Sequence, residues 1–574
     1  MAKLVYGDTV DRKILVCLQN PVYPRTWSYK SVTSLFNFLL GPVSVAFCGH
    51  LGKTQLATVG LSTSVFNVAG MFVVNGLVTA SDTIFAQTYG SPHKSRLEAQ
   101  LKKTMILITM CCVICCSMYI CCEPILLLLG QNPLVAKLTS EYLLYLIPAL
   151  FFASWGLVLT SYIQCQNHVY GPLLVMIVTN CVNALLHYVL LFHLHMDVQA
   201  SAIAQSISFA FQDICYLLYI QLDKSLVEIS YGFSLDPLLE WKEWSWLAIP
   251  GVFMITLEWI LFEIGSFIAG YLGERELAAQ TVMLNIDTLG YTLLPRGVGN
   301  AAAIRVGQYL GGRVAAGPQS VLSTTLLILW IIGPGYFGSY MALRWYIPQI
   351  FTSDLEVIAL AAQLMAVLAT FQLLDGTTGL ISGVLRGAGL QYLGAIINII
   401  CLYFIGAPIS ICLIFIRGMG LMGLWIGFIA GAGVQTVVYL VACTQINWKH
   451  QVERAVKRLK EKSISEQAIN SLNGVYISDF GIRNGLPSLT NGTKNEPAQT
   501  NNTITDVKFR STTAFVIKRV LMFLIVLLIL SVSVGCRLTL RWSDYFGTFC
   551  VYPDGTYVSV SNRTNTDNCT IVIP

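Results

Sequence analysis

Two glutamates lie inside one long apolar stretch of the sequence. Glu258 and Glu263 fall within a run from about Trp246 to Tyr271, longer than the roughly 20 residues that span a bilayer core as a helix. A charge at the centre of such a helix costs at least ~2.5 kcal/mol on insertion scales, and it usually marks a transport or proton site. Five residues at ~100° each place the two acids about 140° apart around the helix. We therefore expect one acid in a polar cavity and the other beside a neighbouring helix or an interface; the alternative is a purely structural pair.

Asp375 and Asp287 are further candidate carboxylates in the second half of the chain. Asp375 lies well inside a later apolar segment, and Asp287 precedes Tyr291 by four residues, which places both on one helix face. Carboxylates bind organic cations, and the rings of Trp259, Phe262 and Tyr291 would add cation–π attraction of ~0.5–2 kcal/mol each. The alternatives are an interhelical hydrogen bond for Asp287 and core or lipid packing for the rings.

An acid in low-dielectric surroundings also gains free energy by taking up a proton. A proton and an organic cation would then compete for one carboxylate, which is the thermodynamic basis of exchange.

The sequence does not support ATP-driven transport, because no Gly-Lys-Ser/Thr sequence follows the glycines at Gly387 and Gly389. We expect no cofactor and no metal site. One apolar segment holds six cysteines that are interpreted as small packing residues, because no His, Asp or Glu lies among them: Cys111, Cys112, Cys115, Cys116, Cys121 and Cys122.

The composition is that of a polytopic helical membrane protein. Of 574 residues, 55% are hydrophobic and only 11% are charged, whereas soluble domains carry about 25% charged residues. The net charge of +5 is small and its basic residues cluster between apolar segments, so nucleic acid is not an expected partner. The chain does not open with a signal-peptide pattern.

Hydropathy predicts thirteen apolar segments in an all-α fold. Their approximate spans are 31–49, 55–86, 104–130, 138–164, 171–194, 198–221, 245–271, 277–310, 321–349, 356–385, 391–415, 419–445 and 520–536. We divide the chain into an amino-terminal cytosolic segment (1–30), an N-lobe (31–222), a cytosolic linker (223–244), a C-lobe (245–445), a disordered cytosolic linker (446–512), a thirteenth helix (513–536) and an extracellular tail (537–574).

The basic loops predict the orientation in the membrane. Lys94 and Arg96 follow the second segment, and Lys457 and Arg458 belong to a basic group after the twelfth. By the positive-inside rule both loops are cytoplasmic, and so is the amino terminus. The thirteenth helix would then carry the tail outside, although Arg537 argues mildly against that direction.

The polar tail contains features of an extracellular segment. Asn562 and Asn568 begin glycosylation acceptor sequences, and Cys550 and Cys569 would be placed to form a disulfide if the tail is outside.

The two halves of the sequence repeat. Gln87-Thr88-Tyr89-Gly90 is echoed 221 residues later by Gln308-Tyr309-Leu310-Gly311. Six helices per repeat is an even number, so the lobes would be related by an axis along the membrane normal, with a cavity between them. At the same offset Asn37 stands where the second half has Glu258. The first half has other buried acids, including Asp82 and Asp213, so the chemistry is expected mainly in the second half, with Asn37 and Asp82 as cavity-lining candidates.

Several motifs together resemble the multidrug and toxin extrusion family in its animal branch, over about residues 34–450. They are Cys48-Gly49-His50-Leu51-Gly52-Lys53, Asp82-Thr83 with Gln87-Thr88-Tyr89-Gly90-Ser91, Leu257-Glu258-Trp259 with Glu263-Ile264-Gly265-Ser266-Phe267, Arg305-Val306-Gly307, Gly383-Val384-Leu385-Arg386-Gly387 and Gly423-Leu424-Trp425. The resemblance implies two six-helix lobes that export organic cations in exchange for protons, usually at the plasma membrane. Animal members often add a thirteenth helix.

The resemblance also assigns residues and exposes departures. Glu258, Glu263 and Asp375 match positions of acids important for transport, with Asp375 replacing the usual glutamate of animal members. Asn285 stands where those members commonly carry a glutamate, and Asp287, two residues on, faces the other way. His187 replaces an asparagine.

The opening of the chain departs from the family as well. Residues 1–33 do not resemble it, and a polar stretch from Thr26 to Thr33 stands where an apolar helix is expected. Either the start of the sequence is a misassigned exon, or the first helix is shortened or altered.

The leading interpretation is a secondary antiporter whose partners are small organic cations, protons and the lipid bilayer; it is not an enzyme. Sodium as coupling ion is one alternative. A lipid or glycolipid flippase is another, and it would need a broader groove with more basic residues. The internal duplication argues against a receptor or channel.

Overall fold

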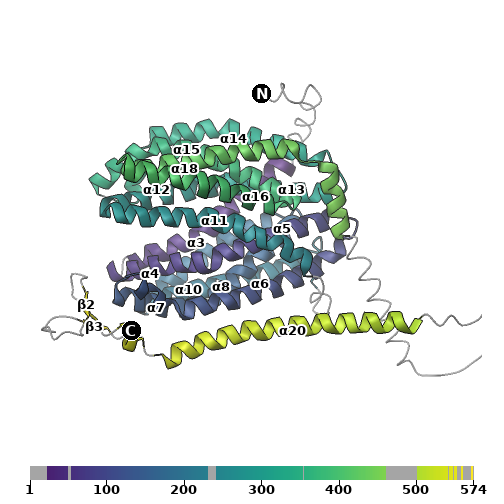
Figure 1. Ribbon diagram of the computed structural model, residues 1–574, viewed down its shortest axis with the longest axis horizontal. Coiled ribbons are helices and arrows are strands. Elements are labelled where there is room, and N and C mark those ends of the chain that lie inside the picture. Colours follow the sequence, from purple (N-terminus) through teal and green to yellow (C-terminus); the bar gives the residue numbers. More distant parts are fainter. Residues whose placement is uncertain are drawn as a thin grey trace, which may run out of the picture.

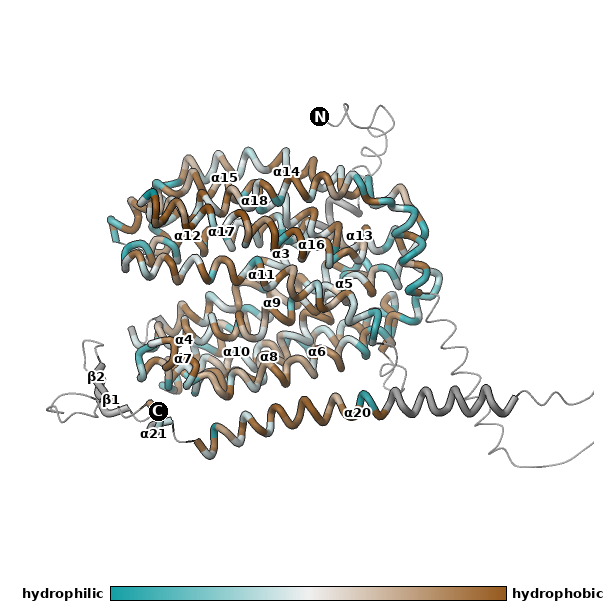
Figure 2. Tube along the Cα trace, viewed as in Figure 1, coloured by the Kyte–Doolittle hydropathy of each residue, from teal (hydrophilic) through white to brown (hydrophobic). Residues whose placement is uncertain are grey.

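The protein, represented by a computed structural model, is described over residues 22–49, 53–229, 241–352, 354–459, 501–540, 542–546, 549–551, 557–559 and 570–572. Long helices run roughly parallel in a bundle (Figure 1). Apolar residues predominate along the helices, and hydrophilic segments gather at the ends of the bundle (Figure 2). Among the described residues, twelve helices are long and apolar enough to cross a membrane, which confirms the predicted polytopic fold. The predicted segment 277–310 is not one of them, because it is divided at Pro295 into two shorter helices.

The N-lobe consists of the helices before residue 223. They are α3 (Val22–Gly49), α4 (Lys53–Phe66), η1 (Asn67–Met71), α5 (Phe72–Gly90), η2 (Lys94–Arg96), α6 (Leu97–Ile120), α7 (Cys122–Leu128), α8 (Pro133–Cys165), α9 (Tyr170–His187), η3 (Tyr188–His193) and α10 (Gln199–Leu222). Helices α4, η1 and α5 form one continuous crossing. The cysteines of α6 lie in the apolar core of this lobe or against it, as expected for packing residues.

The C-lobe consists of the helices from residue 242 onward. They are α11 (Lys242–Leu272), α12 (Glu274–Leu293), α13 (Pro295–Gly311), α14 (Gly317–Ala342), η5 (Pro348–Ile350), α15 (Leu355–Ala388), α16 (Gln391–Asn398), η6 (Ile399–Gly406), α17 (Ala407–Ile411), η7 (Cys412–Ile416) and α18 (Gly420–Gln445). Pro295 separates α12 from α13 because it occupies the first turn of a helix without an N–H to donate. A further helix spans 448–459.

Three predicted boundaries are wrong. The first helix begins at Val22 rather than near residue 31, because Lys30, Ser31 and Thr33 are buried by packing against other helices. Residues 448–459 form a helix within the stretch predicted to be a disordered linker. The carboxyl-terminal helix α20 (Asn501–Thr539) begins before residue 513. At the first helix and at 448–459, tertiary contacts therefore stabilise helix in polar sequence.

The tail after α20 contains α21 (Ser543–Phe546) and a small antiparallel sheet. Strands β1 (Phe549–Val551), β2 (Tyr557–Ser559) and β3 (Thr570–Val572) are ordered β2-β1-β3, with Cys550 paired to Val558 and Ile571. Asn562, Asn568 and Cys569 lie outside the described residues, so the glycosylation and disulfide predictions stay predictions.

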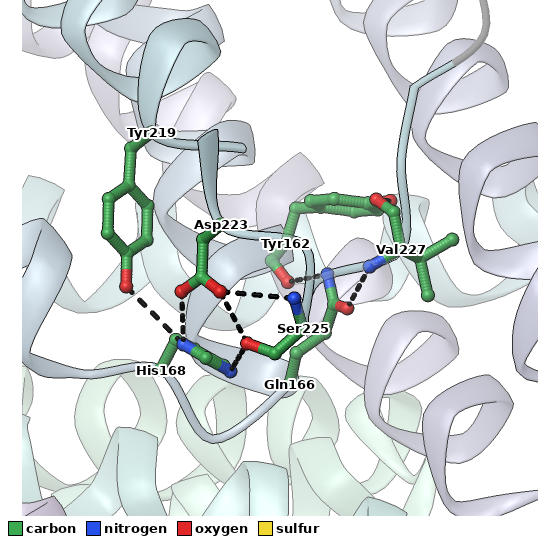
Figure 3. Close-up of polar contacts among 7 residues, drawn as sticks. All are labelled: Tyr162, Gln166, His168, Tyr219, Asp223, Ser225 and Val227. Carbon is green, nitrogen blue, oxygen red and sulfur yellow. Dashed lines mark hydrogen bonds and ion pairs between the residues drawn. The ribbon is translucent and has the colours of Figure 1, made fainter. Parts of the chain in front are cut away.

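Polar contacts at one end of the bundle hold the chain that leaves α10 (Figure 3). Asp223 Oδ2 lies 3.1 Å from His168 Nδ1, and the hydroxyl of Ser225 donates to Asp223 Oδ1 at 2.5 Å. The hydrogen bond from Ser225 holds the pKa of Asp223 below its usual value. Gln166 Oε1 accepts from the Val227 backbone N–H at 2.8 Å. The start of the inter-lobe linker is therefore fastened to the N-lobe.

Helix α20 runs along the outside of the N-lobe, packed against α6 (Figure 1). At one end Arg519 lies over the Trp241 ring, 4.1 Å from its centroid. At the other end Arg537 Nη1 donates to the carbonyl oxygen of Ile120 at 2.8 Å and to Ser140 Oγ at 2.7 Å. The remaining surface of α20 is mostly exposed and apolar, as expected for a helix that faces lipid.

We expect Arg537→Met to loosen α20 from the N-lobe. Hydrogen bonds to a charged group contribute about 1.5–3 kcal/mol each, so the thermal unfolding midpoint of the purified protein should fall by about 2–4 °C. Arg417→Met, at an exposed position, is the matched control and should leave the midpoint unchanged. An equal midpoint in wild type and Arg537→Met would show that these contacts do not hold the helix.

Candidate functional site

The lobes meet through pairs of residues that the sequence repeat relates. A Cβ added at Gly90 would lie 2.7 Å from Cα of Gln308, and one added at Gly311 would lie 3.0 Å from Cα of Gln87. Gln87 and Gln308 are 221 residues apart, and so are Gly90 and Gly311. Reciprocal contacts of this kind arise when two similar halves face each other across a two-fold axis. The structure therefore places the pseudo-symmetry axis of the repeat between α5 and α13.

A second reciprocal pair lies deeper along the same axis. A Cβ at Gly76 would lie 2.9 Å from the Val252 backbone nitrogen, and one at Gly297 would lie 2.6 Å from that of Ser31. The repeat again relates Gly76 to Gly297 and Ser31 to Val252. Only glycine permits backbones to approach this closely. The closest inter-lobe packing thus depends on glycines that the two halves share.

Side-chain hydrogen bonds join the lobes at the end of the bundle that carries Lys94, Arg96 and Arg454, which we call the basic end. They run from Thr83 Oγ1 to the carbonyl oxygen of Arg386 (2.5 Å), from Gln87 Nε2 to that of Gly387 (3.1 Å), from Gln308 Nε2 to that of Cys165 (2.7 Å), from Gln391 Nε2 to Thr83 Oγ1 (2.8 Å) and from Arg96 Nη1 to the carbonyl oxygen of Leu459 (3.1 Å).

Helix 448–459 adds to this junction. It packs on the C-lobe through Ala455, and its Arg458 Nη1 donates to Gln87 Oε1 of the N-lobe at 3.3 Å. Burial lowers the pKa of Arg458. Among the described residues, the inter-lobe hydrogen bonds lie between the middle of the helices and the basic end, so the lobes are joined there.

Three carboxylates of the C-lobe come together near the middle of their helices. Glu258 lies on α11, Asp287 on α12 and Asp375 on α15. Asp287 and Asp375 are 5% and 7% exposed, and Glu258 is partly exposed. Glu258 interacts electrostatically with both aspartates, and the aspartates interact with each other. Like charges this close are not all stable as free carboxylates, so the group favours an added cation or proton.

Gln372 positions Asp287 within this group. With its amide oriented so that both ends are paired, Gln372 donates from Nε2 to Asp287 Oδ1 at 2.7 Å and accepts from the Tyr291 backbone N–H at 3.0 Å. The Tyr340 hydroxyl donates to the nearby carbonyl oxygen of Ile286 at 3.4 Å. Asp287 therefore makes the interhelical hydrogen bond that was the alternative to a cavity role, and it also belongs to the carboxylate group.

Two partly buried arginines lie near the carboxylates. Arg386 interacts electrostatically with Glu258 and with Asp82 of the N-lobe, and its Nη2 donates to Asn300 Oδ1 at 3.2 Å. Arg296 Nη2 donates across the lobe interface to Asn75 Oδ1 at 3.4 Å. No role was predicted for either arginine or for Gln372, although an arginine inside a membrane segment is itself a signal of function.

Glu263 and Asn285 do not join the three carboxylates in the described part of the chain. Glu263 is partly exposed, and no charge interaction links it to another described carboxylate. Asn285 is exposed, and its Nδ2 donates to the carbonyl oxygen of Thr281 on its own helix at 2.8 Å.

The three candidate rings have different neighbours, and Tyr291 interacts electrostatically with Glu258 and Asp375. Phe262 packs edge-on against Phe371 and Phe428, with ring centroids 5.9 and 5.6 Å away, so core packing accounts for it. Trp259, one residue from Glu258, stacks on Phe72 of the N-lobe with centroids 5.3 Å apart. Trp259 is therefore the candidate ring that lies where the lobes meet.

The N-lobe candidates lie on α3 and α5. Asp82 accepts a 2.5 Å hydrogen bond from Ser161 and interacts with Lys30 as well as Arg386. Asn37 is partly buried on α3. His187 lies close to two partners, the Asn183 carbonyl oxygen at 2.8 Å and Ser201 Oγ at 3.0 Å. These two contacts within the N-lobe account for the buried position of His187.

A duplicated helical bundle with carboxylates at mid-depth, beside the junction of its repeats, has the architecture of a secondary membrane transporter. The sequence model of the MatE family matches residues 31–189 and 250–412. The chain belongs to the multidrug and toxin extrusion family of transporters.

Individual relatives agree with this assignment. The mouse multidrug and toxin extrusion protein 2 is 36% identical over 452 residues, which cover 79% of this chain and 77% of the relative. The human multidrug and toxin extrusion protein 1 is 33% identical over 526 residues, covering 89% and 92%. The crystal structure of the eukaryotic MATE transporter AtDTX14 superimposes with a TM-score of 0.74 at 25% identity, covering 78% of this chain and 99% of that one.

Proposed function

We propose that this transporter exports small organic cations in exchange for protons across the plasma membrane. The observation that carries the proposal is the group formed by Glu258, Asp287 and Asp375, three interacting carboxylates on three helices of one lobe. A positive cargo or a proton relieves the same repulsion, so each displaces the other. Trp259 beside Glu258 presents an aromatic surface to an organic cation.

The inter-lobe hydrogen bonds at one end of the bundle support a mechanism of alternating access. We place the basic end in the cytoplasm, with the amino terminus on that side and the tail after α20 outside, because basic loops remain cytoplasmic. The lobes are joined at that end, so the described conformation corresponds to closure toward the cytoplasm. Rocking of one lobe against the other would expose the carboxylates to each side in turn.

Basic residues at the lobe interface bear on the flippase alternative. Arg386 faces the acids Glu258 and Asp82, and Arg296 donates to Asn75. These cations are neutralised or hydrogen-bonded by protein groups, whereas a lipid phosphate would need unengaged ones. The structure therefore supports a cationic cargo better than an anionic headgroup.

Transport into proteoliposomes of known orientation tests the coupling ion. For proton exchange, a fluorescent organic cation should accumulate when the interior is acidic and should leave when the pH gradient is reversed. Sodium coupling predicts a response to a sodium gradient and indifference to pH. Vesicles without protein provide the control. Uptake that ignores the direction of the pH gradient would refute the proposal.

A further inference from the structure

The N-lobe contains a buried carboxylate that the transport site does not use. Asp213 on α10 is 5% exposed, and neither of its carboxylate oxygens has a hydrogen-bond partner. The Gln212 Oε1 atom and the Tyr216 hydroxyl are also buried and unpartnered. An isolated charge inside a protein costs several kcal/mol unless something compensates it. A bound cation or hydrogen-bond donor that contacts these oxygens would remove that cost.

The facing surface of α8 belongs to the same cluster. A Cβ at Gly156 would lie 2.9 Å from Asp213 Oδ1 and 2.5 Å from Gln212 Nε2, so the two side chains rest directly on this glycine. One turn further along α8, Thr160 Oγ1 is buried and unpartnered as well. Thr160 and Tyr216 approach each other without reaching hydrogen-bond geometry, and Tyr216 interacts electrostatically with Asp213. We call Thr160, Gln212, Asp213 and Tyr216 the α8–α10 cluster.

The chemistry of the cluster selects a class of ligand. Its unpartnered atoms are all oxygens: one carboxylate, one amide carbonyl and two hydroxyls. Oxygen donors bind hard cations, whereas zinc and other soft ions prefer His and Cys, which the cluster lacks. No charge interaction with a basic side chain is found for Asp213 in the described part of the chain. A single positive charge bound there would therefore neutralise its carboxylate. A divalent ion would leave an uncompensated positive charge in a low-dielectric interior.

We propose that the α8–α10 cluster is a binding site for a monovalent cation of the sodium class. A cation between α8 and α10 would be coordinated by oxygens of both helices. A proton on Asp213 would neutralise the charge but would pair only one more oxygen. This site is separate from the three carboxylates of the C-lobe, and it does not depend on proton exchange there.

The test measures thermal unfolding of the purified full-length protein. NaCl replaces choline chloride at constant ionic strength and pH, and a saturable rise of about 2–4 °C in the midpoint is expected when sodium exceeds its dissociation constant about tenfold. Asp213→Asn should abolish this rise. The control Asp223→Asn removes an acid at the solvent-accessible end of α10 and should retain it. Glu258→Gln should also retain it, which separates this site from the proposed transport site.

Three results would overturn the proposal. They are the absence of a sodium-dependent rise in wild type, an undiminished rise in Asp213→Asn, and a midpoint that responds to pH alone, which would indicate a proton in place of the metal ion. If Asp213→Asn does not fold, Thr160→Val provides the second variant. It removes one oxygen ligand without altering charge and should raise the sodium concentration of half-maximal effect several-fold; an unchanged value would equally refute the site.

Discussion

Glu258→Gln is expected to lower the exchange of an organic cation for protons by at least about tenfold, equivalent to about 1.4 kcal/mol. The amide keeps the size and polarity of the side chain but cannot carry a negative charge or exchange a proton. Glu258 interacts with both Asp287 and Asp375, so its neutralisation also removes the repulsion that it exerts on them and weakens the demand of the group for a cation. Cargo efflux from proteoliposomes under an imposed pH gradient measures the change.

The matched control for this variant is Glu228→Gln. Glu228 is exposed in the linker that follows α10, so the same substitution there should leave exchange unchanged. Surface expression and the thermal midpoint of both variants must match wild type, so that a lost rate reports on the site rather than on folding. Full exchange by well-expressed Glu258→Gln would remove this residue from the mechanism.

Gly90→Val is expected to prevent the lobes from joining at the basic end. Even a Cβ at this position would come within 2.7 Å of Cα of Gln308, and backbone atoms cannot move aside as a side chain can. Closure at the basic end would then be lost, and exchange should fall by at least about tenfold, because alternating access needs both closed states. Overpacking of this kind typically costs 1–3 kcal/mol, enough to shift a two-state equilibrium.

Cysteine labelling can detect the opening directly. Cys165 is buried, and its carbonyl oxygen accepts the hydrogen bond from Gln308. Its reaction with a membrane-permeant maleimide, followed by peptide mass spectrometry, should be faster in Gly90→Val than in wild type. Gly60→Ala is the control, since no atom lies within 4 Å of the added Cβ. Wild-type labelling and transport in Gly90→Val would show that this contact does not gate the protein.

The membrane crossings could be predicted well from hydropathy because a bilayer imposes one length and one composition on every helix that spans it. The exceptions have physical causes. The polar residues Lys30, Ser31 and Thr33 belong to a helix because other helices bury them. Helix 448–459 forms on the C-lobe surface around Ala455. Neither effect is visible in local hydropathy.

The candidate site could be predicted only in part. Glu258, Asp287 and Asp375 were conspicuous as charges in apolar segments, and the structure brings them together. Helical periodicity separated Glu263 from Glu258 but could not say which of the two faces the other acids. The partner of Asp287, Gln372, is a neutral residue on a different helix, and no spacing rule connects them.

The sequence by itself determined that this protein is a duplicated bundle of membrane helices with acids concentrated in its second half, because apolar length, charge and repeat offset are properties of the chain alone. The tertiary structure decided which faces meet. It paired Gly90 with Gln308 and Gly311 with Gln87 across one axis, and it left Asp213 unpartnered against Gly156. The physical reason is that helical periodicity fixes directions around a single helix, whereas contacts between helices depend on how side chains from distant segments fit together.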